Sequence, residues 1–316
     1  MRVLVTGGSG FVGSYIALEM AKDPNIQAYI FDISRPEFDL PENVRFIEGD
    51  VIYKKSLDRY IQGCDEVYDC AGVLGTHELV FQTERAIDVN VRGAVNVLQS
   101  CLDNGVKKLF HPTKPIFENY WENTYTITKI SAENFAKMYK KVYGMDVTIL
   151  RWMNASGPGQ HIYPVRKFLP LSICLALLGM DIEIYGDGQQ TMDIIDVRDI
   201  AKIAIKAVRL GVGKMEKVWD VGTGQPLTCN DVAKYIIKKT SSSSKIIYVP
   251  MRIGEPYKSN VRARNHNELF ELIDFKLQYD PCRTIDDCIA YYSNLDRWKI
   301  QTAVNYFFQR IRTPKD

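Results

Sequence analysis

A tyrosine and a lysine four residues apart are the first side chains in this sequence whose types and spacing point to chemistry. In the stretch YTITK, Tyr125 and Lys129 would share one face of a helix, with Cβ atoms about 5 to 6 Å apart. An ammonium at that distance favours the phenolate form of tyrosine, whose ordinary pKa is about 10. The pair is therefore a candidate for moving a proton to and from a substrate hydroxyl. The pattern alone also fits an ordinary pair on a helix surface, so the rest of the chain has to decide.

The chain opens with a glycine-rich turn that is typical of dinucleotide-binding proteins. A short apolar run leads into TGGSGFVG, and an apolar-periodic helical pattern follows it. Gly7 permits a tight turn, Gly10 lets the backbone approach a pyrophosphate, and Gly13 lets the helix pack on the sheet, although the first gap is one residue wider than in GxGxxG. At the end of the next apolar run, Asp32 can accept both hydroxyls of an adenosine ribose, which favours NAD over NADP. Arg35 lies close enough to weaken that preference.

Strand and helix patterns alternate along the first half of the chain. Six short apolar runs indicate strands, and they cover residues 2–6, 27–32, 44–50, 66–72, 107–113 and 146–152. Helical patterns separate most of them, and the longest lie at residues 79–104 and 125–143. This alternation predicts an α/β fold of the Rossmann type, a doubly wound parallel sheet that binds its ligands at the carboxyl ends of the strands.

The second half indicates a smaller domain. Beyond Asn154 the alternation loosens, and proline and glycine become frequent. Residues 193–210 again have the pattern of a strand followed by a helix, so they would return to the first sheet. We therefore expect a dinucleotide domain at 1–153 plus 192–212 and a smaller α/β substrate-binding domain at 154–191 plus 213–316, with the substrate in the cleft between them.

Composition excludes several classes of protein. The 40 basic and 38 acidic side chains nearly balance, so no net charge favours nucleic acid or an anionic membrane. Seven cysteines without a CxxC pair read as reduced thiols, and their spacing to the four histidines predicts no metal site. The apolar stretch from Phe168 to Met180 is shorter than the roughly 18 residues of a membrane span. Without a signal-like start, we expect a cytoplasmic enzyme.

Further motifs follow in a fixed order. They are GDV at 49–51, NVRG at 90–93, RWMNASGPGQ at 151–160, GDGQQTMDIIDVRDIA at 186–201 and VGTG at 221–224. Together with TGGSGFVG, Asp32 and YTITK, they resemble the extended short-chain dehydrogenase/reductases, the family of nucleotide-sugar epimerases and dehydratases. The resemblance runs from the first residue to about residue 290 and implies bound NAD, a nucleotide-sugar substrate, and a homodimer that pairs through the two long helices.

The resemblance also implies roles for individual residues. Tyr125 would be the general acid and base, and Lys129 would lower its pKa and bind the nicotinamide ribose. The third catalytic position, a Ser or Thr four residues before an aromatic, matches Thr113 and Phe117, although a plain threonine at a strand end is the alternative. The expected cofactor contacts are Gly7, Gly10, Phe11, Val12, Gly13, Asp32, Asp50, Val51, Ala71 and Lys129.

On the substrate side, four residues match or follow family positions. Asn154 matches an asparagine on the phosphate side of the nucleotide. Arg252, in RIGEP, resembles the arginine that clamps the diphosphate, and a planar guanidinium suits that contact. Thr76 and His77 follow the fourth strand, where relatives contact the hexose, and we expect them to recognise the sugar. A histidine that only caps the next helix fits His77 equally well.

Departures from the family pattern bear on the reaction. Met192 stands where relatives usually carry an arginine, which removes one expected phosphate contact. Only eleven residues separate Thr113 from Tyr125, fewer than we expect for the family, so the loop over the sugar is short. Lys114 and Pro115 hold the slots where the 4,6-dehydratases carry Asp and Glu, and the 3,5-epimerases carry a cysteine in the second of them.

These departures favour the reaction that needs the fewest extra groups. A C4 epimerase that passes through a transient 4-keto sugar needs only the tyrosine and NAD. The alternatives are a ketoreductase that uses dissociable NADPH, a 4,6-dehydratase, and a non-catalytic regulator that binds NAD. His111 and Lys114 add ionisable groups near the chemistry that the family pattern does not explain.

Overall fold

A seven-stranded parallel sheet forms the larger part of the molecule. The computed structural model describes residues 1–116 and 120–309. Its sheet has the strand order β11-β6-β5-β4-β1-β2-β3, and every neighbouring pair is parallel. The strands are β1 (Arg2–Thr6), β2 (Gln27–Asp32), β3 (Val44–Glu48), β4 (Glu66–Asp69), β5 (Lys108–Thr113), β6 (Val147–Trp152) and β11 (Trp219–Val221). The order doubles back at β1, as in a doubly wound sheet, and the predicted fold class is confirmed.

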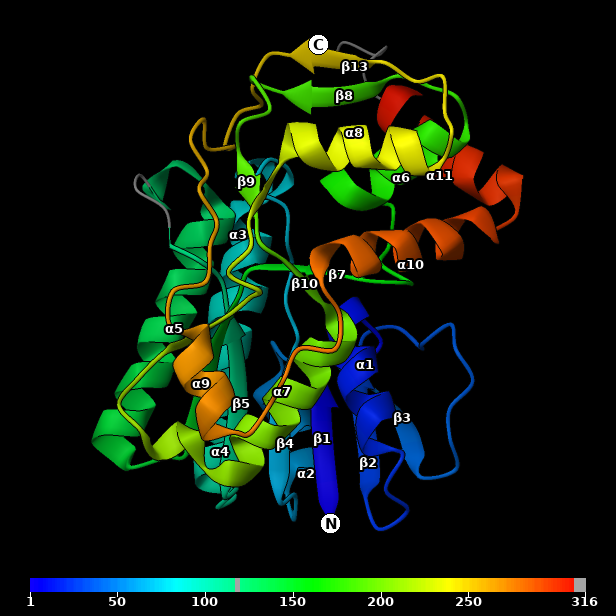
Figure 1. The fold of residues 1–316 in the computed structure, drawn as a ribbon. Coiled ribbons are helices and arrows are strands. Elements are labelled where there is room, and N and C mark those ends of the chain that lie inside the picture. The colour runs from blue at the N-terminus through cyan, green and yellow to red at the C-terminus, as the bar shows by residue number, and fades with distance from the viewer. Residues whose placement is uncertain (117–119, 310–316) are drawn as a thin grey trace.

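Helices cover both faces of this sheet (Figure 1). One face packs against α1 (Phe11–Met20) and α7 (Val197–Leu210), and the other packs against α2 (Lys54–Ile61), α4 (Ala94–Asp103) and α5 (Thr124–Tyr143). Successive residues of a strand point to opposite faces, and β1 follows this rule. Val3 and Val5 lie in the apolar cluster that includes α1 and α7, whereas Leu4 lies in the cluster that includes α2, α4 and α5. This double burial explains why the strands are continuous apolar runs.

The long helix expected at residues 79–104 is interrupted. It consists of a 3₁₀ turn at Glu78–Phe81, α3 (Thr83–Ala86), a π-helical stretch at Ile87–Gly93, and then α4. Gly93 lies where a Cβ atom would come within 2.6 Å of Val51, so the irregular stretch brings backbone close to the loop after β3. The sequence pattern predicted the helical character of this region and missed its breaks.

A smaller lobe has an apolar core of its own. Four helices build it, namely α6 (Phe168–Leu177), α8 (Cys229–Lys239), α10 (Pro281–Ser293) and α11 (Arg297–Gln309). The short strand pairs are β8 (Ile182–Tyr185) with β13 (Ile246–Val249), β7 (Asn154–Ser156) with β10 (Ile194–Asp196), and β9 (Thr191–Met192) with β12 (Leu227–Thr228). Two further 3₁₀ turns lie at Tyr120–Glu122 and Val212–Lys214. None of the helices in the described ranges is long and apolar enough to cross a membrane.

Beyond α7, the chain adds a strand and a helix to the large sheet, whereas β10, at the predicted return, pairs with β7 instead. Strand β11 pairs with β6, and α9 (His266–Leu272) packs beside it, with Leu269 and Phe270 in the same cluster as Trp219. Residues 219–221 and 266–272 thus lie with the sheet, whereas the sequence-based division placed all of 213–316 in the smaller domain. A three-residue strand is too short to show a periodic pattern, which is why the sequence did not reveal it.

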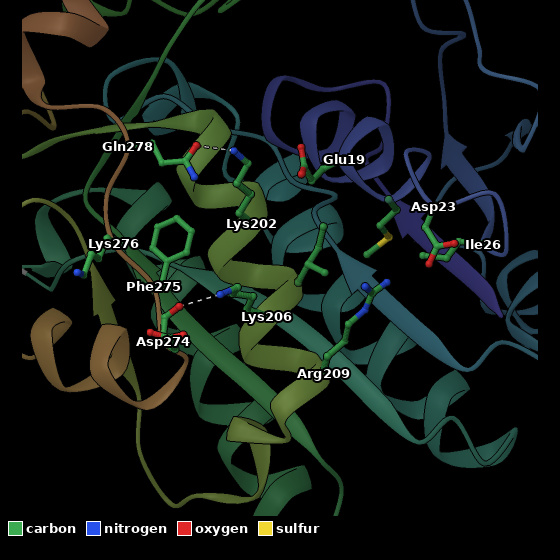
Figure 2. Close-up of a pocket in the computed structure, with 12 residues that line it drawn as sticks. Glu19, Asp23, Ile26, Lys202, Lys206, Arg209, Asp274, Phe275, Lys276 and Gln278 are labelled. Carbon is green, nitrogen blue, oxygen red and sulfur yellow. Dashed lines mark hydrogen bonds between the residues drawn. The ribbon is translucent and has the colours of Figure 1, made fainter.

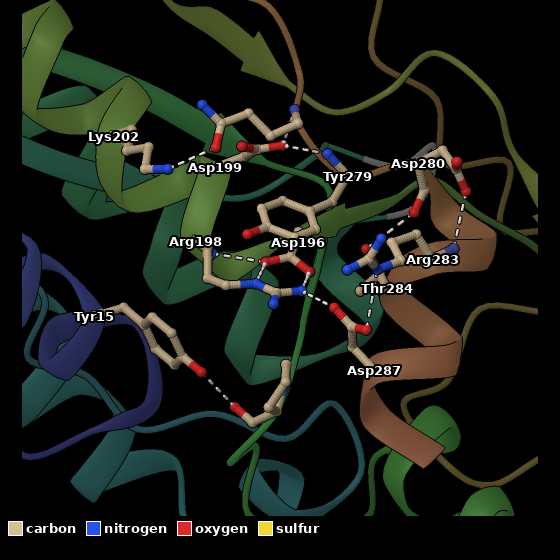
Figure 3. A network of polar contacts seen from close by, with 12 residues as sticks. Tyr15, Asp196, Arg198, Asp199, Lys202, Tyr279, Asp280, Arg283, Thr284 and Asp287 are labelled. Carbon is tan, nitrogen blue, oxygen red and sulfur yellow. Dashed lines mark hydrogen bonds and ion pairs between the residues drawn. The ribbon is translucent and has the colours of Figure 1, made fainter. Parts of the chain in front are cut away.

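A polar network joins the two lobes where β10 runs into α7 (Figure 3). The Asp196 side chain accepts from the Arg198 backbone N–H at 2.9 Å and caps α7. The Arg198 guanidinium donates to Asp196 and to Asp287 of α10, both at 2.7 Å, and lies 3.7 Å from the centroid of the Tyr279 ring. On the other side, the Tyr15 hydroxyl of α1 donates to the Pro158 carbonyl at 2.9 Å.

Candidate active site

The glycine-rich turn has the geometry that a dinucleotide cradle needs. Gly7 has φ +63°, and a Cβ there would come within 2.6 Å of the backbone of Cys70 and Ala71. A Cβ on Gly13 would come within 2.3 Å of the Gly7 carbonyl oxygen. Helix α1 begins at Phe11 with Gly10 as its N-cap, so its free N–H groups face the turn. This close packing leaves backbone donors exposed for a pyrophosphate, and the chain fits the cofactor here.

The ribose end of this cradle also fits. Asp32, at the end of β2, accepts from the Ser9 backbone N–H at 3.0 Å and from that of Ser34 at 3.2 Å. Burial raises the pKa of Asp32, and these two N–H groups oppose the rise. Val51 is buried, and its carbonyl accepts from the Asn96 amide at 2.8 Å. Asp32 thus lies at the end of β2 with its side chain bonded to the backbone of Ser9, within the glycine turn.

Helix α5 carries the tyrosine and the lysine in its first two turns. The Asn123 side chain accepts from the Thr126 backbone N–H at 2.7 Å and caps the helix. Tyr125 and Lys129 are both half-buried. Burial raises the pKa of Tyr125 to about 12 and lowers the pKa of Lys129. The expected lowering of the Tyr125 pKa is therefore absent in the chain alone, because burial disfavours both charged forms.

Thr113 lies at the end of β5 and is buried. Its hydroxyl donates to Glu133 Oε2 at 3.1 Å. The same carboxylate accepts from Arg151 Nη2 at 2.6 Å and from Lys137. Although burial opposes it, Arg151 and Lys137 hold the pKa of Glu133 below its ordinary value. The predictions did not include Glu133, although its spacing of four from Lys129 places it on the same helix face. Phe117, which supported the choice of Thr113, lies outside the described residues.

Lys114 follows Thr113 and lies against α5. Its Nζ donates to Thr126 Oγ1 at 2.9 Å and lies 5.6 Å from the centroid of the Tyr125 ring. Burial lowers the pKa of Lys114 to about 7, and the charge of Glu255 opposes this. The ionisable group that the sequence placed near the chemistry is therefore beside the proposed catalytic tyrosine.

The expected sugar and diphosphate contacts meet at the boundary of the two lobes. Thr76 Oγ1 donates to Glu255 Oε1 at 2.6 Å, and the same oxygen accepts from Arg252 Nη2 at 2.6 Å. His77 Nδ1 lies 2.9 Å from the Ile253 carbonyl oxygen. Arg252 also lies 3.4 Å from Glu78. The structure thus brings Thr76, His77 and Arg252 together, and their side chains hold the two lobes to each other.

A small cavity of about 120 Å³ adjoins Arg252. Its wall includes Arg166, Glu183 and Tyr185, and the Arg166 guanidinium donates to Glu183 at 2.9 Å. Both guanidinium groups lie near the Tyr185 ring, Arg252 at 4.8 Å and Arg166 at 5.0 Å from its centroid. The sequence predictions omitted Arg166, because nothing in the spacing around it marks a site.

Asn154 is held in a different way. Its side-chain oxygen accepts from the Asp193 backbone N–H at 2.9 Å, which ties β7 to the start of β10. Met192, the residue before Asp193, packs against the core of the smaller lobe. Asn154 thus belongs to the β7–β10 pair and Met192 to the β9–β12 pair, and one of the two oxygen lone-pair sites of Asn154 is already used.

A larger cavity of about 500 Å³ lies away from these residues (Figure 2). It lies between the C-terminal half of α1, α7 and residues 274–278. Two of its lysines already have partners, since Lys202 donates to Gln278 at 2.7 Å and Lys206 to the Asp274 carbonyl at 2.7 Å. Because α1 starts at the glycine turn, its far end lies away from the carboxyl edge of the sheet, and this cavity is remote from the chemistry.

Comparison with known proteins identifies the family of this chain. The model of the NAD dependent epimerase/dehydratase family matches residues 3–222. A UDP-N-acetyl-alpha-D-glucosaminuronate decarboxylase of Bacillus cytotoxicus is 28% identical over 81% of this chain and 85% of its own. A putative UDP-glucose 4-epimerase of Methanocaldococcus jannaschii is 26% identical over 81% of this chain and 88% of its own.

A solved structure shows the same fold. The UDP-glucose 4-epimerase of Thermus thermophilus, in complex with NAD, superimposes with a TM-score of 0.81 over 94% of this chain and 100% of its own, at 21% identity. The family match covers well over half of the chain, and the tight packing of the glycine turn agrees with a family that depends on NAD. The chain is therefore an enzyme of the NAD dependent epimerase/dehydratase family, with NAD as its cofactor.

Proposed function

We propose that this enzyme interconverts nucleotide sugars that differ in configuration at C4, through a transient 4-keto sugar. The observation that carries the proposal is that Lys114 and Pro115 follow Thr113 at the end of β5, with Lys114 Nζ 5.6 Å from the centroid of the Tyr125 ring. Removing water or moving a proton at carbon requires a further acid and base. Oxidation and reduction at one hydroxyl requires neither.

In the proposed mechanism, Tyr125 takes the proton of the sugar 4-hydroxyl and later returns it. Thr113 directs its own hydrogen to Glu133, so its oxygen is left to accept a hydrogen bond from that hydroxyl or from the phenol. Lys129 holds a positive charge near the phenol and would bind the nicotinamide ribose. The cofactor, when bound through Gly7, Gly10 and Asp32, supplies the hydride acceptor and donor. The shape of the cleft must then let the keto sugar present its other face.

The proposed substrate is a nucleoside diphosphate sugar. Two relatives are named for UDP-linked sugars. Arg252 places a guanidinium at the boundary of the lobes. Glu78 and Glu255 form ion pairs with that guanidinium. A diphosphate carries the same charge as these two carboxylates together, so it can replace them at Arg252.

We also propose a homodimer. Helix α5 lies along one side of the molecule in Figure 1. Several of its apolar side chains are exposed. Ile127, Phe135 and Val142 are among them, and Ile87 is exposed on the π-helical stretch that packs against α5. This surface supports pairing through α5 and the region of residues 83–103.

The test is turnover without added cofactor. The purified protein is incubated with UDP, GDP, CDP and dTDP sugars, and the C4 epimer is detected by proton NMR. We expect product from the NAD that copurifies with the protein. Product that appears only with added NADPH would establish the ketoreductase instead, release of carbon dioxide would establish a decarboxylase, and loss of water a dehydratase.

The Tyr125→Phe variant tests the catalytic assignment. We expect it to keep the NAD content of the parent protein and to lose at least about 10²-fold in kcat, the usual contribution of a general acid and base. A variant that keeps full activity would refute the assignment. Binding of NAD without turnover of any sugar in the panel would favour the regulator.

A further inference from the structure

The residue after Thr113 contacts the same helix as the threonine. Successive residues of a strand point to opposite faces, yet Thr113 donates to Glu133 of α5 at 3.1 Å and Lys114 Nζ donates to Thr126 Oγ1 of α5 at 2.9 Å. Strand β5 ends at Thr113, so the alternation stops there and both side chains reach α5. Lys114 thus belongs to the side chains that surround the first turns of this helix.

The amino group of Lys114 has a defined place beside the phenol. Lys114 is 9% exposed, and its partner Thr126, the residue after Tyr125, is fully buried. Lys114 Nζ lies 5.6 Å from the centroid of the Tyr125 ring. The Thr126 backbone N–H donates to the Asn123 cap, so the cap, the phenol and the amino group are held in one turn of helix. A sugar hydroxyl that reaches Tyr125 therefore brings its neighbouring substituents close to Lys114.

Packing alone does not account for a lysine at this position. Burying an ammonium costs free energy, and burial lowers the pKa of Lys114 to about 7. An apolar side chain of similar length would fill the same space without this cost. A buried lysine beside a proposed catalytic residue is instead typical of a functional site, where stability is given up for a charge that a ligand uses.

Lys114 and Arg252 serve different parts of a nucleotide sugar. Arg252 forms ion pairs with Glu78 and Glu255, and the proposed function gives it the diphosphate. Lys114 contacts the turn that carries Tyr125, and the proposed function places the sugar 4-hydroxyl there. The substituent next to that hydroxyl is the group on C5. In a uronic acid this group is a carboxylate, the partner that an ammonium pairs with best.

We propose that Lys114 is a specificity-determining residue that binds a carboxylate on C5 of the sugar, so that the substrate is a nucleotide-linked uronic acid. This rests on the proposed function, because it takes the 4-hydroxyl to lie at Tyr125. An ammonium carries three N–H donors, so it can bind a carboxylate while it donates to Thr126. A neutral hexose presents only a hydroxyl there, and it lacks the attraction between opposite charges.

The test compares nucleotide sugars that differ only in the group on C5. The pairs are UDP-glucose with UDP-glucuronate, UDP-galactose with UDP-galacturonate, and GDP-mannose with GDP-mannuronate. Isothermal titration calorimetry measures their affinities for the NAD-saturated Tyr125→Phe protein, which should not convert the sugar during the titration. We expect at least one acid to bind about 10-fold or more tightly than its neutral partner, the usual effect of a hydrogen bond to a charged group. Adding Lys114→Met should abolish this preference.

Two controls in the same background make the comparison specific. Arg252→Met should weaken both members of a pair by a similar factor, because they share the diphosphate. Lys22→Met removes an exposed positive charge and should leave the preference unchanged. Lys114→Gln, which is also uncharged, repeats the test if the methionine variant does not fold.

Equal affinities within every pair, tighter binding of the neutral members, or no binding of any acid would overturn the inference. A preference for an acid that survives the loss of Lys114 would overturn it too. The binding readout does not depend on turnover. A protein that prefers an acid through Lys114 and, with Tyr125 intact, releases carbon dioxide from it would refute only the proposed function. A protein that epimerises neutral sugars at C4 without any preference for an acid would refute only the role of Lys114.

Discussion

At the scale of single residues, the hydroxyl of Thr113 can act on a substrate as a hydrogen-bond acceptor. Its proton is directed to Glu133 at 3.1 Å, and Glu133 is fixed by Arg151. The oxygen can therefore accept a hydrogen bond from a sugar hydroxyl and orient it toward the phenol. We expect Thr113→Val, which keeps the shape, to lower kcat about 10²-fold, the low end of what a positioned proton-transfer group contributes. Steady-state kinetics with the preferred sugar nucleotide measures this.

The matched control is Thr113→Ser. It keeps the hydroxyl and loses only a methyl group, so it should retain kcat within about one order of magnitude. If the valine and serine variants are equally impaired, the methyl group and its packing matter more than the hydroxyl. Thr113 would then be a plain strand-end threonine.

Lys114 has a charge state that links stability to pH. Burial lowers its pKa in the folded chain to about 7 from 10.5. Between these pH values the unfolded chain binds more protons than the folded one, so this group makes the free energy of unfolding rise with pH. Below pH 7 the ammonium is charged in both states, and its burial costs the folded state most. We expect Lys114→Met to increase the free energy of unfolding there by on the order of 1–3 kcal/mol.

This gain should shrink toward pH 10, where the unfolded lysine also loses its proton. Urea denaturation at pH 6, 8 and 10 measures the difference between parent and variant. Lys22→Met is the control, because Lys22 is exposed and its removal should give a small difference at every pH. A gain for Lys114→Met that is constant over this range would show that packing, and not charge, produces it.

At the scale of elements, the first turn of α5 depends on its cap. Tyr125 is the second residue of that helix, and Asn123 holds the turn through the Thr126 N–H. We expect Asn123→Ala to lower the free energy of unfolding by about 1 kcal/mol, the usual cost of a lost N-cap. Because the loosened turn carries the tyrosine, kcat should fall as well. Urea denaturation and steady-state kinetics measure the two effects.

Asn123→Asp is the control for the cap. An aspartate also caps helices well, so it should keep both stability and kcat close to those of the parent. A variant Asn123→Ala with lower stability and unchanged kcat would show that the position of Tyr125 does not depend on the cap.

Elements with a long hydrophobic pattern were the ones that could be predicted from the sequence. Most strands of the large sheet are apolar runs that the sheet buries, and helices α1 and α5 are apolar or capped, so a local pattern predicts each of them. Strand β11 has three residues, and the π-helical stretch at Ile87–Gly93 differs from an α-helix only in which carbonyl each N–H meets. Tertiary contacts determine both, and a local pattern does not contain them.

At the scale of the whole molecule, the candidate site also has parts that the sequence predicts and parts that depend on tertiary contacts. The cofactor turn and the Tyr125–Lys129 spacing are local, and they could be read from the sequence. The bond from Thr76 to Glu255 joins residues 179 positions apart, and the contact of Arg252 with Glu78 joins residues 174 positions apart. Only the return of the chain to the lobe boundary creates these contacts. Thr76 and His77 were singled out for the sugar, and their partners in the other lobe could not be foreseen.

The outer face of α5 bears on how whole molecules associate. Ile127, Phe135 and Val142 are 40%, 39% and 64% exposed, and their spacing puts them on one side of the helix. Apolar side chains gathered on one helix face are typical of an interface between protein chains.

We expect a dimer of the 36.1 kDa chain in solution, and we expect Phe135→Asp to convert it to a monomer, because a dimer would bury the new charge twice, once from each chain. Sedimentation equilibrium measures the mass. Ile247→Asp, at a residue 42% exposed on β13 of the smaller lobe, is the matched control and should remain a dimer. A parent protein that sediments as a monomer, or a Phe135→Asp variant that remains dimeric, would show that α5 does not form the interface.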